Sequence, residues 1–267
     1  MNDYGAKRIV CLTEETTEAL YLIGEQDRIV GISGFTVRPS LARKEKPKVS
    51  AFTSAKIDKI LALKPDLVLA FSDMQADIVA ELVRAGLQVH VFNQRSINEI
   101  FEMLYSLGGL IGEPEKAARL MAQYQQNIDD CLQQASLYKV RPRVYFEEWD
   151  EPLISTIQWV AELVEIAGGT DCFPELSVQA GGKGRIIADP QHVIDRQPDI
   201  IIGSWCGKKF RPERLAQRDG WAAIPAVKNQ QIFEIKSVDI LQPGPAALSD
   251  GLSQLQQIIH HWVEQYG

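Results

Sequence analysis

A segment that combines a helical pattern, a Pro-Asp turn and an apolar strand occurs twice in this chain. The first copy covers residues 57–70 and the second covers residues 191–203. In each copy the helical pattern stops before a Pro-Asp pair, at Pro65 and Pro198, and an apolar run follows at once. Two copies so far apart, with a helical stretch between them, predict two similar α/β lobes and not a solenoid.

The pattern around each copy predicts a parallel sheet. Strand-like runs at 8–12, 28–32, 67–70 and 88–92 are separated by single helical patterns. Between residues 97 and 137 only helical patterns occur, and strands return after 143. We therefore predict an α/β fold of two similar three-layer lobes with mostly parallel sheets, bridged by one long backbone helix. The expected division is 1–95 for the first lobe, 96–140 for the helical linker and 141–267 for the second lobe.

Charge and hydropathy exclude several classes of function. The net charge of −7 and the pI near 5.2 argue against nucleic acid and against an anionic membrane surface. No apolar run reaches the length of a membrane span, so no membrane insertion is expected. The first twenty residues lack the pattern of a secretory leader. As written, the chain is expected to be a cytoplasmic monomer, or periplasmic if a leader has been trimmed away.

The four cysteines give no sign of redox or metal chemistry. Cys11, Cys131, Cys172 and Cys206 lie far apart, with no CxxC pair and no histidine at zinc-ligand spacing. Such cysteines are typical of small buried apolar residues, although a disulfide stays open at this point.

The residues that follow each strand define a candidate ligand site. Ligands of open α/β sheets lie beyond the carboxyl ends of the strands, and two facing lobes would enclose a cleft there. Aromatic rings with a few carboxylates are typical of a small-molecule pocket. The candidate ligand-binding residues chosen by this rule are Glu14, Glu15, Phe35, Phe52, Ser72, Met74, Glu148, Trp149, Trp205 and Cys206.

These residues have simpler interpretations as well. Trp149 and Trp205 could cap the edge of the sheet, and Glu14 and Glu15 could interact with the dipole of the helix that they begin. The second lobe repeats an acidic pair at the same place. Facing pairs could therefore hold a cation, a metal or an amine-bearing ligand.

The sequence argues against catalysis. None of the four histidines follows a predicted strand, and Cys206 has no evident base beside it. The glycine-rich stretch 181–185 lacks Walker spacing and a preceding strand, so it is interpreted as a loop.

Three segments, 57–70, 159–169 and 220–229, resemble class III solute-binding proteins of the helical-backbone metal-receptor group. The resemblance covers nearly the whole chain. It implies two α/β lobes bridged by one long helix and a ligand such as cobalamin, haem or a ferric siderophore. The chain is most similar to cobalamin-binding members, whose cleft aromatics match Phe35 and Phe52. A third aromatic of those members falls near Arg185, so one wall of the pocket differs.

The resemblance also implies a partner. Importer-linked members present one acidic residue from each lobe to an ABC permease, at positions that match Asp58 and Gln191. Asp58 keeps the charge and Gln191 does not, which argues against delivery to a transporter.

We therefore expect a non-catalytic binding protein that captures a bulky chelate in the cleft between the lobes. A cobalamin-type corrinoid is the expected ligand, held without a covalent cofactor in a largely preformed pocket. The alternatives are a ferric siderophore or haem, a metal ion, and, in another class, a cytoplasmic enzyme or chaperone acting on a chelate. The acidic pairs would repel an anionic siderophore, which lowers that alternative.

Overall fold

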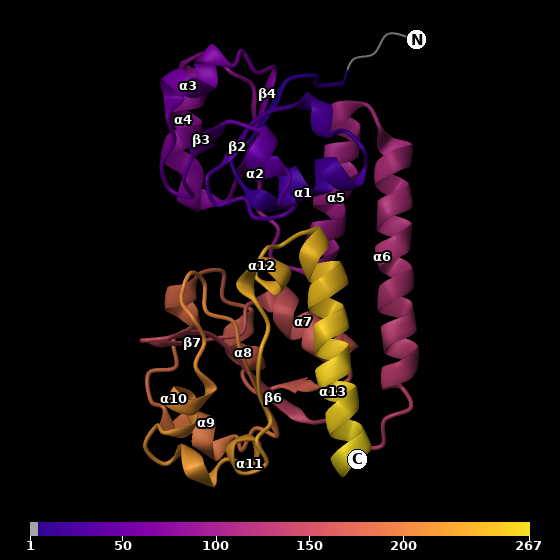
Figure 1. Cartoon of the computed structure of the whole chain (residues 1–267), viewed down its shortest axis with the longest axis vertical. Coiled ribbons are helices and arrows are strands. Elements are labelled where there is room, and N and C mark those ends of the chain that lie inside the picture. The colour runs from indigo at the N-terminus through magenta and orange to yellow at the C-terminus, as the bar shows by residue number, and fades with distance from the viewer. Residues whose placement is uncertain (1–4) are drawn as a thin grey trace. The chain divides into compact units, whose positions relative to one another are not determined.

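The computed structural model describes residues 5–267 as two compact units. The first unit comprises the described residues up to Gln94 together with Asn98–Tyr124, and the second comprises Arg95–Ile97 and Gln125–Gly267. The long helix α6 (Pro114–Ala135) begins in the first unit and ends in the second. The predicted α/β class with two mostly parallel sheets and a long connecting helix is confirmed (Figure 1).

The first unit contains a five-stranded sheet in which every neighbouring pair is parallel. The strand order is β3-β2-β1-β4-β5. All carboxyl ends therefore meet at one edge. The strands are β1 (Ile9–Cys11), β2 (Ile29–Ser33), β3 (Lys48–Ser50), β4 (Leu67–Phe71) and β5 (Val89–Phe92). The helices are α1 (Glu14–Leu22), η1 (Gln26–Arg28), α2 (Ala42–Glu45), α3 (Ile57–Ala62), η2 (Asp73–Gln75), α4 (Ala76–Arg84) and α5 (Ile97–Ile111).

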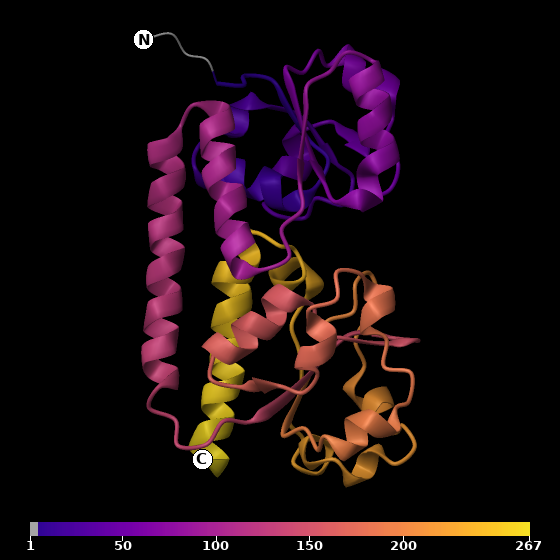
Figure 2. The same cartoon turned by 180° about the vertical axis from the view of Figure 1, so that it is seen from behind.

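Alternation along the strands explains the layers of the first unit. Val10, Val68 and Ala70 lie on one face, where they pack with Ile60 of α3 and Leu82 of α4. The alternating residues of β1 and β4 point to the opposite face and are buried as well: Ile9, Cys11, Leu67, Leu69 and Phe71. Figure 2 shows α5 beside the start of α6. A Cβ on Gly108 of α5 would lie 2.6 Å from the Cβ of Ala117, so this helix pair approaches closely because a glycine is present.

The second unit has a sheet of order β10-β9-β6-β7, with β8 also paired to β6. Only the β6–β7 pair is antiparallel. The strands are β6 (Arg143–Asp150), β7 (Leu153–Ser155), β8 (Thr170–Asp171), β9 (Ile200–Gly203) and β10 (Ile232–Glu234). The helices are α7 (Gln158–Ile166), α8 (Pro174–Ser177), η3 (Gly182–Arg185), α9 (Gln191–Asp195), α10 (Pro212–Ala216), η4 (Trp221–Ala223), α11 (Pro225–Lys228), α12 (Ser237–Ile240), η5 (Ala247–Gly251) and α13 (Leu252–Tyr266).

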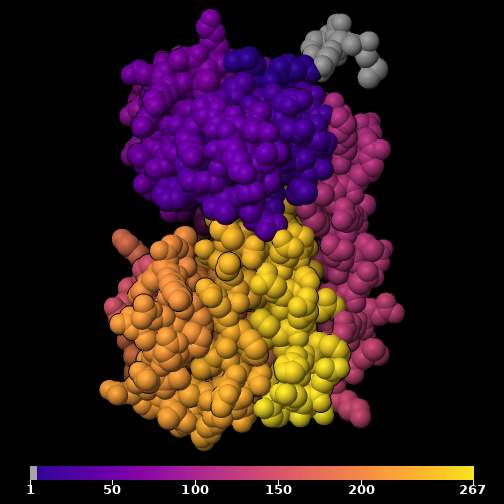
Figure 3. Space-filling model, viewed as in Figure 1, coloured from indigo at the N-terminus to yellow at the C-terminus, as the bar shows by residue number. Residues whose placement is uncertain are grey.

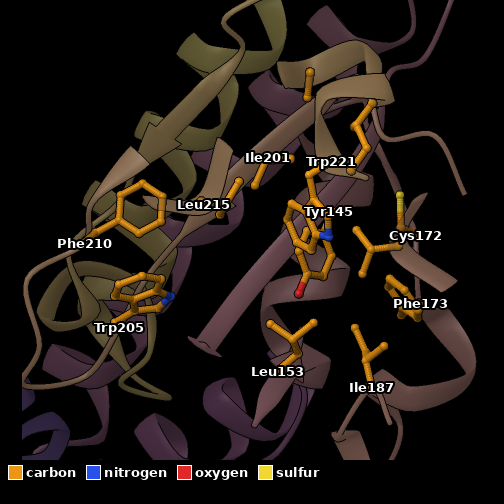
Figure 4. Packing of buried hydrophobic residues seen from close by; sticks show 13 residues of the cluster. Tyr145, Leu153, Cys172, Phe173, Ile187, Ile201, Trp205, Phe210, Leu215 and Trp221 are labelled. Carbon is orange, nitrogen blue, oxygen red and sulfur yellow. The ribbon is translucent and has the colours of Figure 1, made fainter. Parts of the chain in front are cut away.

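Aromatic side chains fill the core on one face of the second sheet. The Tyr145 ring makes edge contacts with Phe173 and Trp221, at centroid distances of 5.7 and 6.0 Å (Figure 4). On the other face α7 and α13 cover the sheet, and α13 forms part of the molecular surface (Figure 3). Within residues 5–267 no helix combines the length and the hydropathy needed to cross a bilayer.

Candidate functional site

Exposed apolar side chains lie at the carboxyl edge of the first unit's sheet. We define this edge by Phe35, Phe52, Ser72 and Met74. Phe35 follows β2, Phe52 follows β3, and Met74 lies in η2 directly after β4. The Phe35 ring is 63% exposed, Met74 is 49% exposed and Phe52 is half-buried. Apolar side chains that gather on the surface in this way are typical of a binding surface.

The loop that carries Phe35 is held by side chains from two neighbouring helices. Oε2 of Glu14, at the start of α1, accepts hydrogen bonds from the backbone N–H groups of Val37 and Arg38. The Arg43 guanidinium of α2 donates to the carbonyl oxygens of Gly34, at 3.0 Å, and Thr36, at 2.8 Å. The loop is therefore fixed although its aromatic ring is exposed.

Gln75 connects the Phe52 loop to the end of β4. Its side chain is fully buried, accepts from the Phe71 N–H at 2.9 Å and donates to the Phe52 carbonyl oxygen at 2.8 Å. Ser72 is also buried, and its Oγ accepts from the Met74 N–H at 3.3 Å. Ser72 therefore shapes this edge through the turn that it caps, and Met74 is the exposed member of the pair.

Glu14 and Glu15 are both buried within the first unit. Glu15 is 1% exposed, and its Oε1 accepts from the Thr13 hydroxyl at 2.6 Å. Burial raises the pKa of each carboxyl from 4.5 to about 7. Their places at the first turn of α1 agree with the helix-dipole interpretation. Glu14 contributes to the candidate surface by holding the Phe35 loop.

The acidic residues at the end of β6 are all paired with cations of the same unit. The Glu147 carboxylate binds the Arg218 guanidinium at 2.6 and 2.9 Å. Glu148 binds Arg185, whose side chain is 2% exposed and also donates to the Ser155 carbonyl oxygen at 2.7 Å. Asp150 binds Lys208. Because these charges are neutralised internally, they give no reason to disfavour an anionic chelate.

The two tryptophans of the second unit differ in exposure. Trp205 is 5% exposed, its Nε1–H donates to Glu147 Oε1 at 3.1 Å, and its ring makes an edge contact with Phe210 at 5.0 Å (Figure 4). Trp149 is half-buried and donates to the Glu151 carbonyl oxygen at 2.9 Å. Trp149 can therefore offer a ring face to a ligand, whereas Trp205 acts mainly as support.

Lys208 lies beside both candidate tryptophans and was not selected from the sequence. Its Nζ lies 5.1 Å from the ring centroid of Trp205 and 5.4 Å from that of Trp149. The available signal was its position in the loop after β9, beside the exposed Cys206. A lysine in a loop is common, so that signal alone would not have selected it.

The structure also contains a polar pocket that the sequence did not predict. It has a volume of about 310 Å³ and lies in the first unit, where β5 leads toward α5. Asn93, Gln94, Glu99 and Glu102 are among its lining residues. Within residues 5–267 no group of three or more His, Cys, Asp or Glu side chains is placed to hold a metal ion.

The two positions compared with permease-docking residues are exposed. Asp58 lies in the first turn of α3, and Gln191 begins α9 and donates to Asp195 Oδ1 at 2.8 Å. The helices α3 and α9 belong to the two copies of the sequence repeat. The two residues therefore occupy similar places in the two units.

A sequence profile described as "Periplasmic binding protein" matches residues 9–238. This match covers most of the chain, so the protein belongs to the periplasmic binding protein family, whose members are non-catalytic proteins that bind solutes.

Two relatives match the chain over nearly its full length. One is a Bacillus subtilis protein named as an uncharacterised ABC transporter substrate-binding lipoprotein, YvrC. It is 25% identical, and the alignment covers 95% of this chain and 80% of the relative. A vitamin B12-binding protein of Vibrio cholerae is also 25% identical and covers 94% of this chain and 88% of its own length.

Solved structures share the fold. A possible iron-binding protein of Staphylococcus epidermidis has a TM-score of 0.83 at 24% identity, covering 96% of this chain and 99% of its own. The vitamin B12-binding protein BtuF of Vibrio cholerae has a TM-score of 0.77 at 23% identity, and the match covers 98% of this chain and 99% of BtuF. IsdE of S. aureus in complex with haem has a TM-score of 0.80 at 20% identity, and the match covers 96% of this chain and 100% of IsdE.

Proposed function

We propose that this protein is the substrate-binding component of an ABC importer and that its ligand is a bulky chelate, with a cobalamin-type corrinoid as the first candidate. The observation that carries the proposal is the set of exposed apolar side chains at the first unit's carboxyl edge. Phe35, Phe52 and Met74 follow three strands of one parallel sheet. A large planar ligand would bury this surface, which would otherwise be left in water at a cost of about 25 cal/mol per Å².

The second unit has fewer exposed groups at the ends of its own strands. Trp149 offers a half-buried ring that packs against the core cluster containing Trp205, and the Glu148–Arg185 ion pair involves the residue before it in β6. Cys206 is exposed in the same loop region. In this proposal Glu14, Glu15 and Ser72 shape the surface from beneath, because their side chains are buried.

Haem or a ferric siderophore is the second candidate ligand. The paired carboxylates at the end of β6 favour it, because they leave no free negative charge there to repel a carboxylate-bearing chelate. Proteins that share the fold include one described as possibly iron-binding and one in complex with haem.

The proposal includes the transporter, the compartment and the division of the chain. Relatives named as a substrate-binding lipoprotein and as vitamin B12-binding proteins support a protein that acts outside the cytoplasmic membrane with an ABC permease. In this proposal the protein is a monomer, and the exposed Asp58 and Gln191 face the permease although Gln191 carries no charge. The proposed segments are 1–95, 96–140 and 141–267, with the middle one as the connecting helical part.

A ligand panel tests the proposal. Cyanocobalamin, cobinamide, haemin and a ferric siderophore are each added at micromolar concentration, and the melting temperature and tryptophan emission are recorded. A ligand at 100 times its Kd adds about 2.7 kcal/mol to the free energy of unfolding and so raises the melting temperature by several degrees. Stabilisation by one chelate class names the ligand. No shift with any of the four overturns the proposal.

A further inference from the structure

The ammonium group of Lys208 lies in a cage built from three other residues. Its Nζ contacts both carboxylate oxygens of Asp150, at 2.7 and 2.6 Å. The rings of Trp205 and Trp149 lie within 5.4 Å of the same nitrogen. A carboxylate with two indole faces is a combination that recognises ammonium groups, since the ring quadrupole and the negative charge both attract a cation.

The walls of this cage are better fixed than its occupant. Trp205 is buried and is hydrogen-bonded to Glu147, and only 9% of the Asp150 side chain is exposed. The Lys208 side chain is 35% exposed. Lys208 lies in a loop without helix or strand structure, and the neighbouring Gly207 has a positive φ of 71°. Lys208 can therefore leave the cage while the cage keeps its shape.

We propose that this cage is a subsite for an ammonium group carried by the ligand, and that Lys208 is its displaceable occupant. The inference rests on the proposed function, because Trp149 and Trp205 are among the residues assigned to the chelate. It adds a chemical class to that function, which is a chelate with a primary or methylated amine on a flexible arm.

A ligand ammonium group that replaces Lys208 fits the cage better than an anionic ligand group that Lys208 would bind. If Lys208 turned toward an anionic ligand group, the Asp150 carboxylate would stay buried without a partner, which is costly. An incoming ammonium keeps that carboxylate paired. The lysine is tethered beside the cage and competes intramolecularly with an external amine, so removing it should tighten binding of that amine.

Titration with a small amine tests the cage alone. n-Butylammonium chloride is added to wild type, Lys208→Met, Lys209→Met and the double variant Asp150→Asn/Lys208→Met, with tryptophan emission and calorimetry as readouts. We expect Lys208→Met to bind at least tenfold more tightly than wild type. Lys209→Met is the matched control because Lys209 is the exposed neighbour, and it should behave as wild type. The double variant should lose the tighter binding of butylammonium expected for Lys208→Met. Uncharged n-butanol should not bind.

A matched chelate pair tests the subsite in the unaltered protein, so the result does not depend on whether a variant folds. A ferric trihydroxamate with a pendant primary amine is compared with its N-acetylated form. Binding of the amine form at least fivefold more tightly supports the inference. The inference is overturned by equal affinity for the two forms, or by Lys208→Met binding butylammonium no better than wild type. A panel that yields no chelate while Lys208→Met still binds the amine would instead reject the proposed function alone.

Discussion

The Asp199 carboxylate accepts a hydrogen bond from the Arg143 backbone N–H at 2.9 Å, and both of its oxygens accept from the Arg143 guanidinium. The other copy of the repeat has the same backbone contact, because Asp66 accepts from the Arg8 backbone N–H, also at 2.9 Å, while the Arg8 guanidinium donates to the carbonyl oxygens of Leu63 and Lys64. In both copies the aspartate of the Pro-Asp pair accepts from a backbone N–H at the start of the neighbouring strand: Arg143 is the first residue of β6, and Arg8 directly precedes β1. The aspartate of each repeat therefore connects the end of a helix to the start of a central strand by a hydrogen bond.

Replacing these aspartates tests that role. Asp199→Ala should lower the free energy of unfolding by about 1 kcal/mol, because it leaves a strand amide and the Arg143 guanidinium with fewer acceptors. Asp66→Ala should have a similar effect in the first unit. Urea denaturation measures both, and Asp219→Ala is the control because that aspartate is exposed. Equal stability of all three variants would contradict the account.

The sequence was sufficient to predict most of the architecture. The repeat predicted the paired helix and strand elements, and the helical stretch expected between residues 97 and 137 is observed as α5 and α6. β3 and β7 were not predicted, since each has only three residues and no long apolar run. Such strands form because a neighbouring strand offers hydrogen-bonding groups, which periodicity along the chain does not reveal.

The candidate site was harder to predict than the fold. Listing the residues after each strand selected Phe35, Met74 and Trp149, which are at least partly exposed. The same rule also selected Trp205 and Glu15, which are buried. Their burial depends on partners distant in sequence or on the packing of the whole unit. The rule finds residues at the correct edge of the sheet but not the direction in which each side chain points.

The buried carboxyls predict how stability depends on pH. Burial raises the pKa of Glu14 and Glu15 to about 7 and that of Asp171 to about 6. A raised pKa means that the folded state binds the proton more tightly than the unfolded state, so this contribution is fully present below the unfolded pKa. It is lost as the pH rises through about 7. Each glutamate should make the protein about 2 kcal/mol more stable at pH 5.5 than at pH 8.

Glu15→Gln isolates one of these groups. Urea denaturation at pH 5.5 and pH 8 should show a smaller difference in this variant than in wild type, because glutamine does not titrate. The account fails if wild type is more stable at pH 8, or if Glu15→Gln leaves the difference unchanged.

The ion pair between Glu147 and Arg218 should be costly to break from one side. Glu147 has no exposed surface, and Arg218→Met leaves its carboxylate buried without the bidentate partner. A loss of about 3–5 kcal/mol in the free energy of unfolding is expected. Arg214→Met, a change at an exposed arginine of the same region, should cost much less. Similar losses in the two variants, measured by chemical denaturation, would show that the pair has no such role.

The hydrogen bonds from Arg43 to the Phe35 loop should matter more for ligand affinity than for stability. Arg43→Met removes the donor to the Gly34 and Thr36 carbonyls, so the loop should become mobile and chelate affinity should fall by about fivefold. The melting temperature should change by only about 2 °C, since Arg43 is exposed. Lys44→Met is the matched control for both measurements. Unchanged affinity in Arg43→Met would argue that the loop does not contact the ligand.

The central claim is that a bulky chelate binds at the apolar carboxyl edge that includes Phe35. Calorimetric titration of wild type, Phe35→Ala and Tyr105→Ala with the chelate that stabilises the protein most tests it directly. Tyr105 is the control because it is an exposed aromatic residue of α5 that does not belong to the apolar edge defined by Phe35. The account predicts micromolar or tighter binding by wild type and Tyr105→Ala, and at least tenfold weaker binding by Phe35→Ala. Wild-type affinity in Phe35→Ala, or no binding of any chelate to wild type, would contradict it.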